Sequence, residues 1–287
     1  MRWLLIFVWV TAWAQPVAVQ KPVFPDDTQD PKLAGGAELL EAVCPGHVVV
    51  GQQFECDGPC STYTNAPERW VGNWTLMRAV RGHFLAPDSD DAVLAMSGCE
   101  PHSENFGGTI LLTRESGSWK KLWYKAGVET RQCHKVKQAT GREILVCLGG
   151  YGGQGFVSTS LYVEDLTTPT PALMANTQPD GNLFEVEDNV ATCGVYLGPD
   201  EPPKPFPLQR AYLQRVIFDA GPDGKLKRLS IYGREGTRPM TPKDAKDCIN
   251  EHVAGAPHKG LDFTPQTKPF HVIFNFDGTR FKRVGKN

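Results

Sequence analysis

Along most of the chain, short hydrophobic runs alternate with polar residues and end at clusters of Gly, Pro, Asp and Asn. Alternation with a period of two, broken by turn-forming residues, is typical of half-buried β-strands. The pattern predicts strands at Trp74–Val80, Ala92–Met96, Gly108–Arg114, Lys120–Tyr124, Ile144–Leu148, Ser160–Glu164, Leu213–Phe218, Leu226–Tyr232 and Val272–Phe276.

The clearest turn lies in "FNFDGTRF", residues 274–281. Asp277-Gly278 suits a two-residue hairpin turn, because both positions require positive φ angles. Such a turn is expected to place Phe274 opposite Phe281 on one face of the sheet.

Helical signals are few. A short helix is expected at 37–43, and a second at 242–252, where Thr241 supplies the cap and Pro242 the first helical position. A chain so poor in helix predicts an all-β fold, with a β-propeller, a β-sandwich or a barrel as the candidate architectures.

The N-terminus resembles a secretory signal peptide. A basic residue, Arg2, precedes an apolar run that ends in Ala12-Trp13-Ala14, and cleavage is expected before Gln15. The run is too short to span a bilayer, which takes about 20 helical residues. Residues 1–14 are therefore predicted to direct export, and the mature protein is expected to be secreted or periplasmic.

The remaining chain divides by composition. Residues 15–37 contain four prolines and little periodicity, which predicts a flexible leader. Residues 38–287 are expected to form a single all-β domain.

All eight cysteines follow the apolar N-terminus, which fits a disulfide-stabilised protein of an oxidising compartment. Cys133 and Cys147 are each seven residues from Thr140, at the turn of an expected hairpin. Opposed residues of a hairpin approach disulfide distance, so the spacing predicts a Cys133–Cys147 bond. The partners of the other cysteines stay open, and the C-x₃-C at Cys56 and Cys60 fits a zinc site less well than a disulfide framework.

Charge excludes some classes of partner. The chain has 30 basic and 32 acidic residues, and its net charge is −2. Its Lys and Arg residues are not concentrated in any run, so neither a nucleic acid nor an anionic membrane surface is an expected partner. No other stretch of the sequence is long and apolar enough to span a membrane either.

A weak internal repeat follows the strands. The apolar strands Ala92–Met96 and Ile144–Leu148 lie about 50 residues apart, each between a turn and a glycine-containing loop. Residues 213–236 repeat part of the same order. This period is typical of propeller blades of about four strands.

Residues 82–165, and more faintly 210–235, resemble FG-GAP/VCBS-type β-propeller repeats. The similarity rests on Gly82-His83-Phe84, an acidic loop at 88–91, the strand after it, and Gly107-Gly108 before a further strand. The resemblance implies a propeller whose acidic loops bind calcium through carboxylates and carbonyls. The candidate ligands are the acids of the first and third copies: Asp88, Asp90, Asp91, Asp219 and Asp223.

The first acidic loop lacks the bending glycine of the family's pattern, and the second copy, "KQATGRE", lacks the acids. A solvated turn is the alternative interpretation of Asp88–Asp91. Calcium is thus the one candidate cofactor. The G-x-G-x-x-G match at 150–155 does not predict a dinucleotide site, because a β-branched strand follows where a helix is required.

Candidate catalytic residues are His102 and Glu104, in a polar loop, and His134 beside Cys133. Common hydrolase and haem motifs such as G-x-S-x-G, H-E-x-x-H and C-x-x-C-H are not found. The preferred hypothesis is an exported binding or scaffold module, rather than an enzyme, that recognises a protein or glycan outside the cytoplasm. A secreted hydrolase of polysaccharides or phosphoesters, and a structural envelope protein, are the alternatives.

Overall fold

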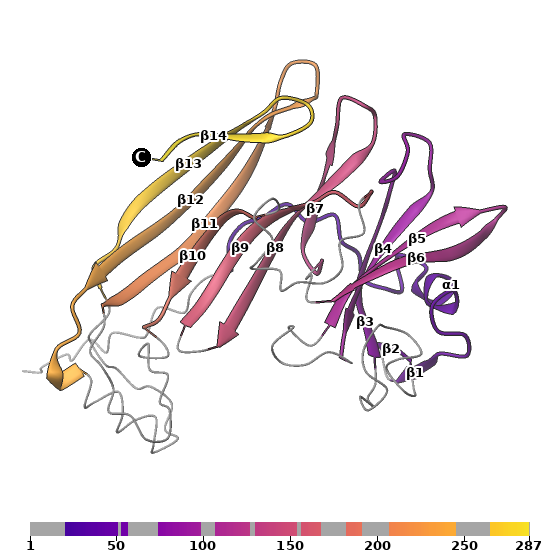
Figure 1. The fold of residues 1–287 in the computed structure, drawn as a ribbon, viewed down its shortest axis with the longest axis horizontal. Coiled ribbons are helices and arrows are strands. Elements are labelled where there is room, and N and C mark those ends of the chain that lie inside the picture. Colours follow the sequence, from indigo (N-terminus) through magenta and orange to yellow (C-terminus); the bar gives the residue numbers. More distant parts are fainter. Residues whose placement is uncertain are drawn as a thin grey trace, which may run out of the picture.

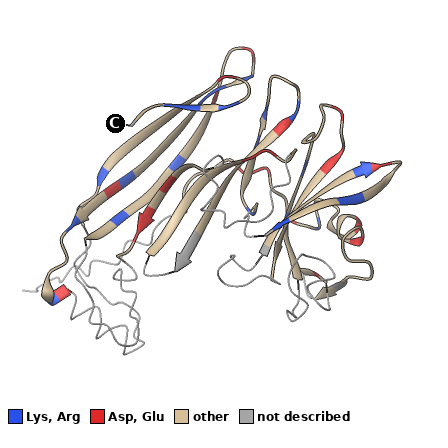
Figure 2. Ribbon diagram, in the orientation of Figure 1, with Lys and Arg blue, Asp and Glu red and all other residues tan. Residues whose placement is uncertain are grey.

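The computed structural model describes most of the chain after residue 20. The described ranges are 21–50, 53–56, 74–98, 107–126, 130–153, 156–167, 182–190, 207–244 and 265–286. Over these residues the protein consists mainly of three antiparallel sheets, with helix α1 (Gly36–Glu41) at one side (Figure 1). The all-β prediction is confirmed. Basic and acidic residues are interspersed over the three sheets (Figure 2).

The first sheet has six strands, which follow one another in chain order. They are β1 (Val48–Val50), β2 (Gln53–Cys56), β3 (Trp74–Gly82), β4 (Asp91–Ser97), β5 (Gly107–Glu115) and β6 (Ser118–Ala126).

The second and third sheets have four strands each. The second contains β7 (Cys133–Lys137), β8 (Glu143–Gly153), β9 (Phe156–Glu164) and β10 (Asn182–Asp188), and the third contains β11 (Leu208–Ala220), β12 (Leu226–Arg238), β13 (Lys268–Phe276) and β14 (Phe281–Lys286). The backbone N–H of Asn189, just after β10, donates to the carbonyl of Gln209 on β11 at 2.9 Å. This contact brings the two sheets together edge to edge, and they curl into a half-barrel (Figure 1).

Three apolar clusters lie between these layers. The first cluster joins α1 to one face of the first sheet, and includes Leu40, Trp74 and Leu94. A second cluster lies between the first and second sheets, and a third fills the space between the second and third. Central strands β4 and β8 contribute to a cluster on each face, which explains why their sequences read as continuous apolar runs.

The segment before α1 ties the sheets together. In this strap (residues 21–31), Val23 forms two backbone hydrogen bonds with β11, both of 2.9 Å. Asp27 donates its N–H to a carbonyl of β7 at 2.7 Å, and Gln29 exchanges two hydrogen bonds with β3, of 2.8 and 3.1 Å. These hydrogen bonds involve residues 21–31 only, and the flexible leader expected at 15–37 stays a prediction. The prolines of the strap exclude a regular strand, but its backbone still pairs with each sheet in turn.

The propeller expected from the repeat is not what the described residues show. The first sheet has six strands rather than four, and the second and third meet edge to edge instead of standing as separate blades. The strands matched by the repeat are β4 and β8, each inside an antiparallel meander. A period of about 50 residues reveals such meanders, but it does not specify how they pack.

The hairpin between β13 and β14 differs from the expected register. Phe276, not Phe274, pairs with Phe281, and their ring centroids lie 4.7 Å apart. The Asp277 carboxylate accepts hydrogen bonds from the N–H groups of Thr279 and Arg280, at 3.0 and 2.9 Å. This side chain therefore stabilises a longer loop than the two-residue turn that Asp-Gly predicts.

The hairpin between β7 and β8 has the predicted register. Cys133 lies opposite Cys147, and the two form a disulfide bond. A second disulfide joins Cys44, after α1, to Cys56 on β2. All four cysteines that the structure describes are therefore oxidised.

The helix expected at 242–252 is described only at its beginning. Residues 242–244 are helical, and the hydroxyl of Thr241 accepts the N–H of Asp244 at 3.2 Å. In return, the Asp244 carboxylate accepts the N–H of Thr241 at 2.8 Å. The predicted cap is thus present as a reciprocal pair. Within the described ranges, membrane-spanning helices of sufficient length and apolarity are not found.

Candidate functional site

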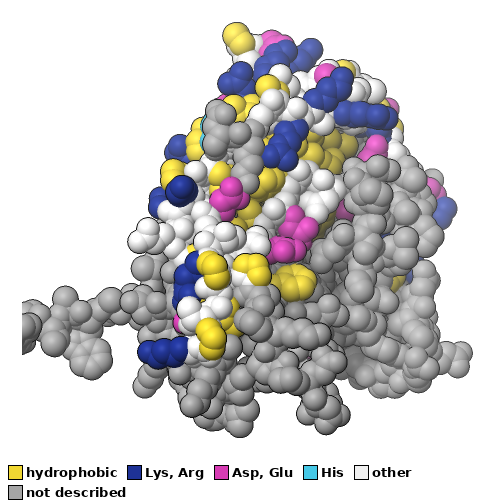
Figure 3. Space-filling view, turned by 60° about the vertical axis from the view of Figure 1, so that its left-hand side comes forward, with side chains coloured by type: hydrophobic (Ala, Val, Ile, Leu, Met, Phe, Trp, Pro, Cys, Tyr) yellow, Lys and Arg dark blue, Asp and Glu magenta, His cyan; other side chains and the backbone are white. Residues whose placement is uncertain are grey.

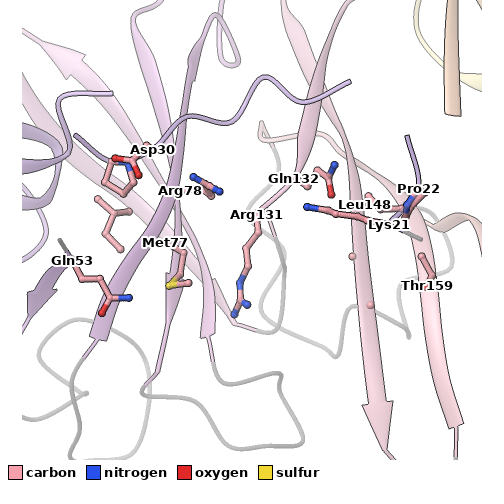
Figure 4. Close-up of a pocket in the computed structure, with 14 residues that line it drawn as sticks. Lys21, Pro22, Asp30, Gln53, Met77, Arg78, Arg131, Gln132, Leu148 and Thr159 are labelled. Carbon is pink, nitrogen blue, oxygen red and sulfur yellow. The ribbon is translucent and has the colours of Figure 1, made fainter. Parts of the chain in front are cut away.

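A groove opens between the first and second sheets, beside the strap (Figure 4). Its volume is about 550 Å³. The lining comes from four parts of the fold: the strap, strands β2 and β3, the residues before β7, and strands β8 and β9. These lining residues are Lys21, Pro22, Asp30, Pro31, Gln53, Leu76, Met77, Arg78, Arg131, Gln132, Leu148, Gly149, Gly150 and Thr159.

A β-bulge in β3 turns a basic side chain toward this groove. Leu76 pairs with Met96 on β4, but Arg78 pairs with the adjacent Ala95, so Met77 is the extra residue. Simple alternation would have placed Arg78 on the same face as Leu76, which is buried against α1. The bulge instead leaves Arg78 exposed in the groove lining. Bulges of this kind often redirect side chains at functional sites.

Two more basic residues reach the groove from other elements. Lys21 belongs to the strap, and Arg131 precedes β7 and donates to the Ser97 hydroxyl at 3.5 Å. Figure 4 shows Arg78 and Arg131 in the space between β3 and β8, with Lys21 extending toward them from the strap side. Three basic side chains from three separate segments of the chain thus line one groove.

Among the described residues that line the groove, three are basic and one is acidic. Lys21 and Arg78 form no ion pair with any residue that the structure describes. The one acid in the lining, Asp30, is exposed and accepts the backbone N–H of Lys32 at 3.0 Å. Such an arrangement attracts carboxylate or phosphate groups, and the guanidinium groups suit bidentate hydrogen bonds to them.

Gly150, one of the lining residues, packs closely against β9. A side chain at Gly150 would bring its Cβ within 2.9 Å of the Ser158 carbonyl oxygen on β9. Backbone atoms cannot easily move away, so this position favours glycine. The Gly-rich loop of the sequence therefore contributes to the groove by strand packing, and not by phosphate binding at a helix.

Asp91, a calcium candidate and the first residue of β4, has a structural role. Asp91 is fully buried, and its carboxylate accepts the backbone N–H groups of Phe84 and Leu85, both at 2.8 Å. The hydroxyl of Thr113 on β5 donates to the other oxygen at 2.7 Å. These donors use most of the lone pairs of the carboxylate.

The other four calcium candidates are exposed. Asp88 is exposed, and Asp90 forms an ion pair of 3.6 Å with an arginine of β5. In the third copy, the backbone N–H of Lys225 holds the pKa of Asp223 below its usual value, while Asp219 is exposed. Over the described ranges, three His, Cys, Asp or Glu side chains do not come together in a way that can hold a metal ion. Calcium binding stays a prediction.

Of the three candidate catalytic residues, only His134 lies within the described ranges. The Nδ1 atom of His134 lies 2.8 Å from Oδ2 of Asp27 on the strap, and its ring packs on Phe218 at 4.3 Å. His134 thus fastens the strap and does not line the groove. His102 and Glu104 lie outside the described residues.

A buried ion pair between the first two sheets was not predicted. Lys125 on β6 lies 3.0 Å from Glu164 on β9, and both side chains are more than nine-tenths buried. Burial raises the pKa of Glu164, and the attraction of Lys125 offsets this only in part. Removing two charges from water costs free energy, which their mutual attraction offsets. Loss of either partner would therefore leave an uncompensated buried charge.

Comparison with known proteins assigns neither a family nor a function to this chain. The fold does not test the resemblance of residues 82–165 to FG-GAP/VCBS repeats, which stays a prediction. No protein-family model, curated protein or solved structure matches this chain.

Proposed function

We propose that this protein is an exported binding module that recognises a protein or glycan outside the cytoplasm through the groove between its first two sheets. The observation that supports this most is the bulge at Met77, which directs Arg78 into a groove already lined by Lys21 and Arg131. A strand irregularity and an excess of basic over acidic side chains in the described lining occur at the same place, and together they favour ligand binding.

Export is supported by two features. The N-terminal run up to Ala14 has the order of a signal peptide. The Cys44–Cys56 and Cys133–Cys147 disulfides fit an oxidising compartment.

Titration of the full mature chain with defined polymers tests the proposal. Poly-L-glutamate and polygalacturonate represent the protein and glycan classes, and neutral dextran is the control. We expect saturable binding of at least one acidic polymer by calorimetry, and loss of that binding in Arg78→Glu. Arg283→Glu is the matched control, because Arg283 is equally exposed but lies on β14. Equal loss in both variants would contradict a role for the groove.

The hydrolase alternative has its own readout in the same experiment. Released reducing ends from polygalacturonate, or released phosphate from a phosphoester panel, would favour it. The described groove lining contains a single carboxylate, that of Asp30, and His134 is engaged with the strap. The binding hypothesis therefore accounts for these residues better.

A further inference from the structure

We infer that the ligand of the groove is an acidic peptide segment of a partner protein, with apolar side chains among its carboxylates. This inference rests on the proposed function and specifies its ligand class. It draws on the basic residues of the groove, its apolar lining, and the contrast with a second basic surface on the third sheet.

The basic residues define where carboxylates bind. Lys21, Arg78 and Arg131 come from the strap, β3 and the residues before β7, so their charges do not follow a single strand. A ligand that meets all three must present several anionic groups along its length. Arginine binds a carboxylate through paired hydrogen bonds, whereas lysine acts as a mobile point charge.

The apolar lining defines what lies between the carboxylates. Pro22 and Met77 are half-buried in the lining, and edges of Leu76 and Leu148 complete it. Methionine is flexible and polarizable, and it adapts to varied apolar side chains. A peptide supplies Leu, Val or Phe side chains for this surface, whereas a uronic-acid polymer presents mainly hydroxyl groups. The mixed lining therefore favours a peptide over an acidic glycan.

The third sheet carries a larger number of basic side chains than the groove lining. This basic tip gathers at one end of the sheet (Figure 3) and consists of Lys225, Lys227, Arg228, Arg280, Lys282 and Arg283. Asp223 and Asp277 each form an ion pair of 3.5 Å within it. All six residues are exposed, and Lys282 and Arg283 lie on the edge strand β14, where charged side chains discourage pairing with other chains. It is thus a suitable control surface for nonspecific attraction.

The test uses three probes with the full mature chain. They are a synthetic peptide that alternates Glu with Leu and Gly, the same peptide with Gln for Glu, and an oligogalacturonate of matched charge. We expect the Glu peptide to bind in fluorescence anisotropy, and the Gln version and the oligogalacturonate to bind at least about tenfold more weakly, or about 1.4 kcal/mol.

Variants locate the binding. Arg78→Glu and the milder Arg78→Gln are expected to weaken peptide binding at least about tenfold, while Arg283→Glu on the basic tip leaves it within about twofold. Thermal melts show that each variant is folded. Exposed positions such as these rarely change stability by more than about 0.5 kcal/mol.

The outcomes separate the inference from the proposed function. If the oligogalacturonate binds as tightly as the peptide and depends on Arg78, the peptide inference is wrong and the binding module stands. If the peptide binds but depends on Arg283 instead, both fail. Failure of all three probes to bind also overturns both.

Discussion

Asp91 shows how one residue can suggest a metal site and serve the fold instead. The acidic run at 88–91 predicts calcium, yet Asp91, where β4 begins, is the one acid of the run that is buried. Its hydrogen bonds organise the turn at residues 84–85. The sequence shows that a carboxylate is present, but it does not show whether that carboxylate is buried.

Replacing this residue tests the structural role. Asp91→Ala leaves two backbone N–H groups and the Thr113 hydroxyl without their acceptor, so we expect the free energy of unfolding to fall by about 3 kcal/mol. Asp88→Ala, at an exposed neighbour, should change it by less than about 0.5 kcal/mol. Urea denaturation measures both. Equal effects, or a calcium-dependent effect at Asp88, would favour the metal interpretation.

The Lys125–Glu164 pair makes a second prediction at this scale. Glu164→Gln leaves a buried ammonium group without its counter-charge and should lower the free energy of unfolding by about 3 to 5 kcal/mol. Lys125→Met combined with Glu164→Leu removes both charges and should cost much less. Chemical denaturation of the three proteins measures the difference. A double variant as unstable as the single one would show that the pair itself stabilises the fold.

Residues of the candidate site were harder to predict than residues of the core. Arg78 stands in a run where alternation alone places it against α1, and only the bulge at Met77 redirects it. A break in alternation was visible in "WTLMRAV", but a bulge depends on the partner strand, which the sequence does not identify.

At the scale of elements, the turn between β13 and β14 shows what the side chain of a turn residue contributes. Hydrogen bonds from the Thr279 hydroxyl, and then from the N–H groups of Arg280 and Thr279, hold the pKa of Asp277 well below its usual range. The charged carboxylate therefore stabilises the folded state at neutral pH, and this contribution is lost as the pH falls through the low folded-state pKa.

The pH dependence of one variant follows. Asp277→Ala should lower the melting temperature at pH 7, and the difference from the unmodified protein should shrink as the pH falls from about 4 toward 2. Asp219→Ala, at an exposed acid of β11, is the control and should show no such trend. Thermal melts across this pH range measure it. A difference that is constant with pH would contradict the role of the carboxylate.

Most strands were predictable because their alternation is a local signal, as was the disulfide within the β7–β8 hairpin. The phenylalanine register of the last hairpin was wrong, because the Asp277 side chain lengthened the turn. Short strands such as β1, and strands with weak alternation such as β10, were missed for lack of that signal.

At the scale of the whole molecule, the strap decides how the three sheets relate. It pairs with β11, β7 and β3 in succession, and Lys21 and Asp30 at its two ends line the groove. These contacts join residues far apart in the sequence, which is why neither the strap nor the sheet arrangement followed from local patterns. For the same reason, the repeat in the sequence led us to expect a propeller, because local patterns show the repeated strands but not how the sheets pack.

The attachment of the strap can be tested at one residue. The Asp27 carboxylate accepts the N–H of Lys135 at 2.7 Å and contacts His134, so Asp27→Ala should lower the free energy of unfolding by roughly 2 kcal/mol. It should also speed hydrogen exchange in residues 21–31. Asp30→Ala, which loses a hydrogen bond only to Lys32, is the control. Unchanged exchange in Asp27→Ala would show that the backbone pairs alone hold the strap.

The most direct test of the account is a hydrogen-exchange footprint of the full mature chain with the alternating Glu peptide bound. Binding in the groove predicts protection of the strap (residues 21–31), of 76–78 on β3 and of 148–150 on β8. Protection confined to 280–283 on the basic tip, or no protection in the strap and β3, would contradict the groove as the binding site.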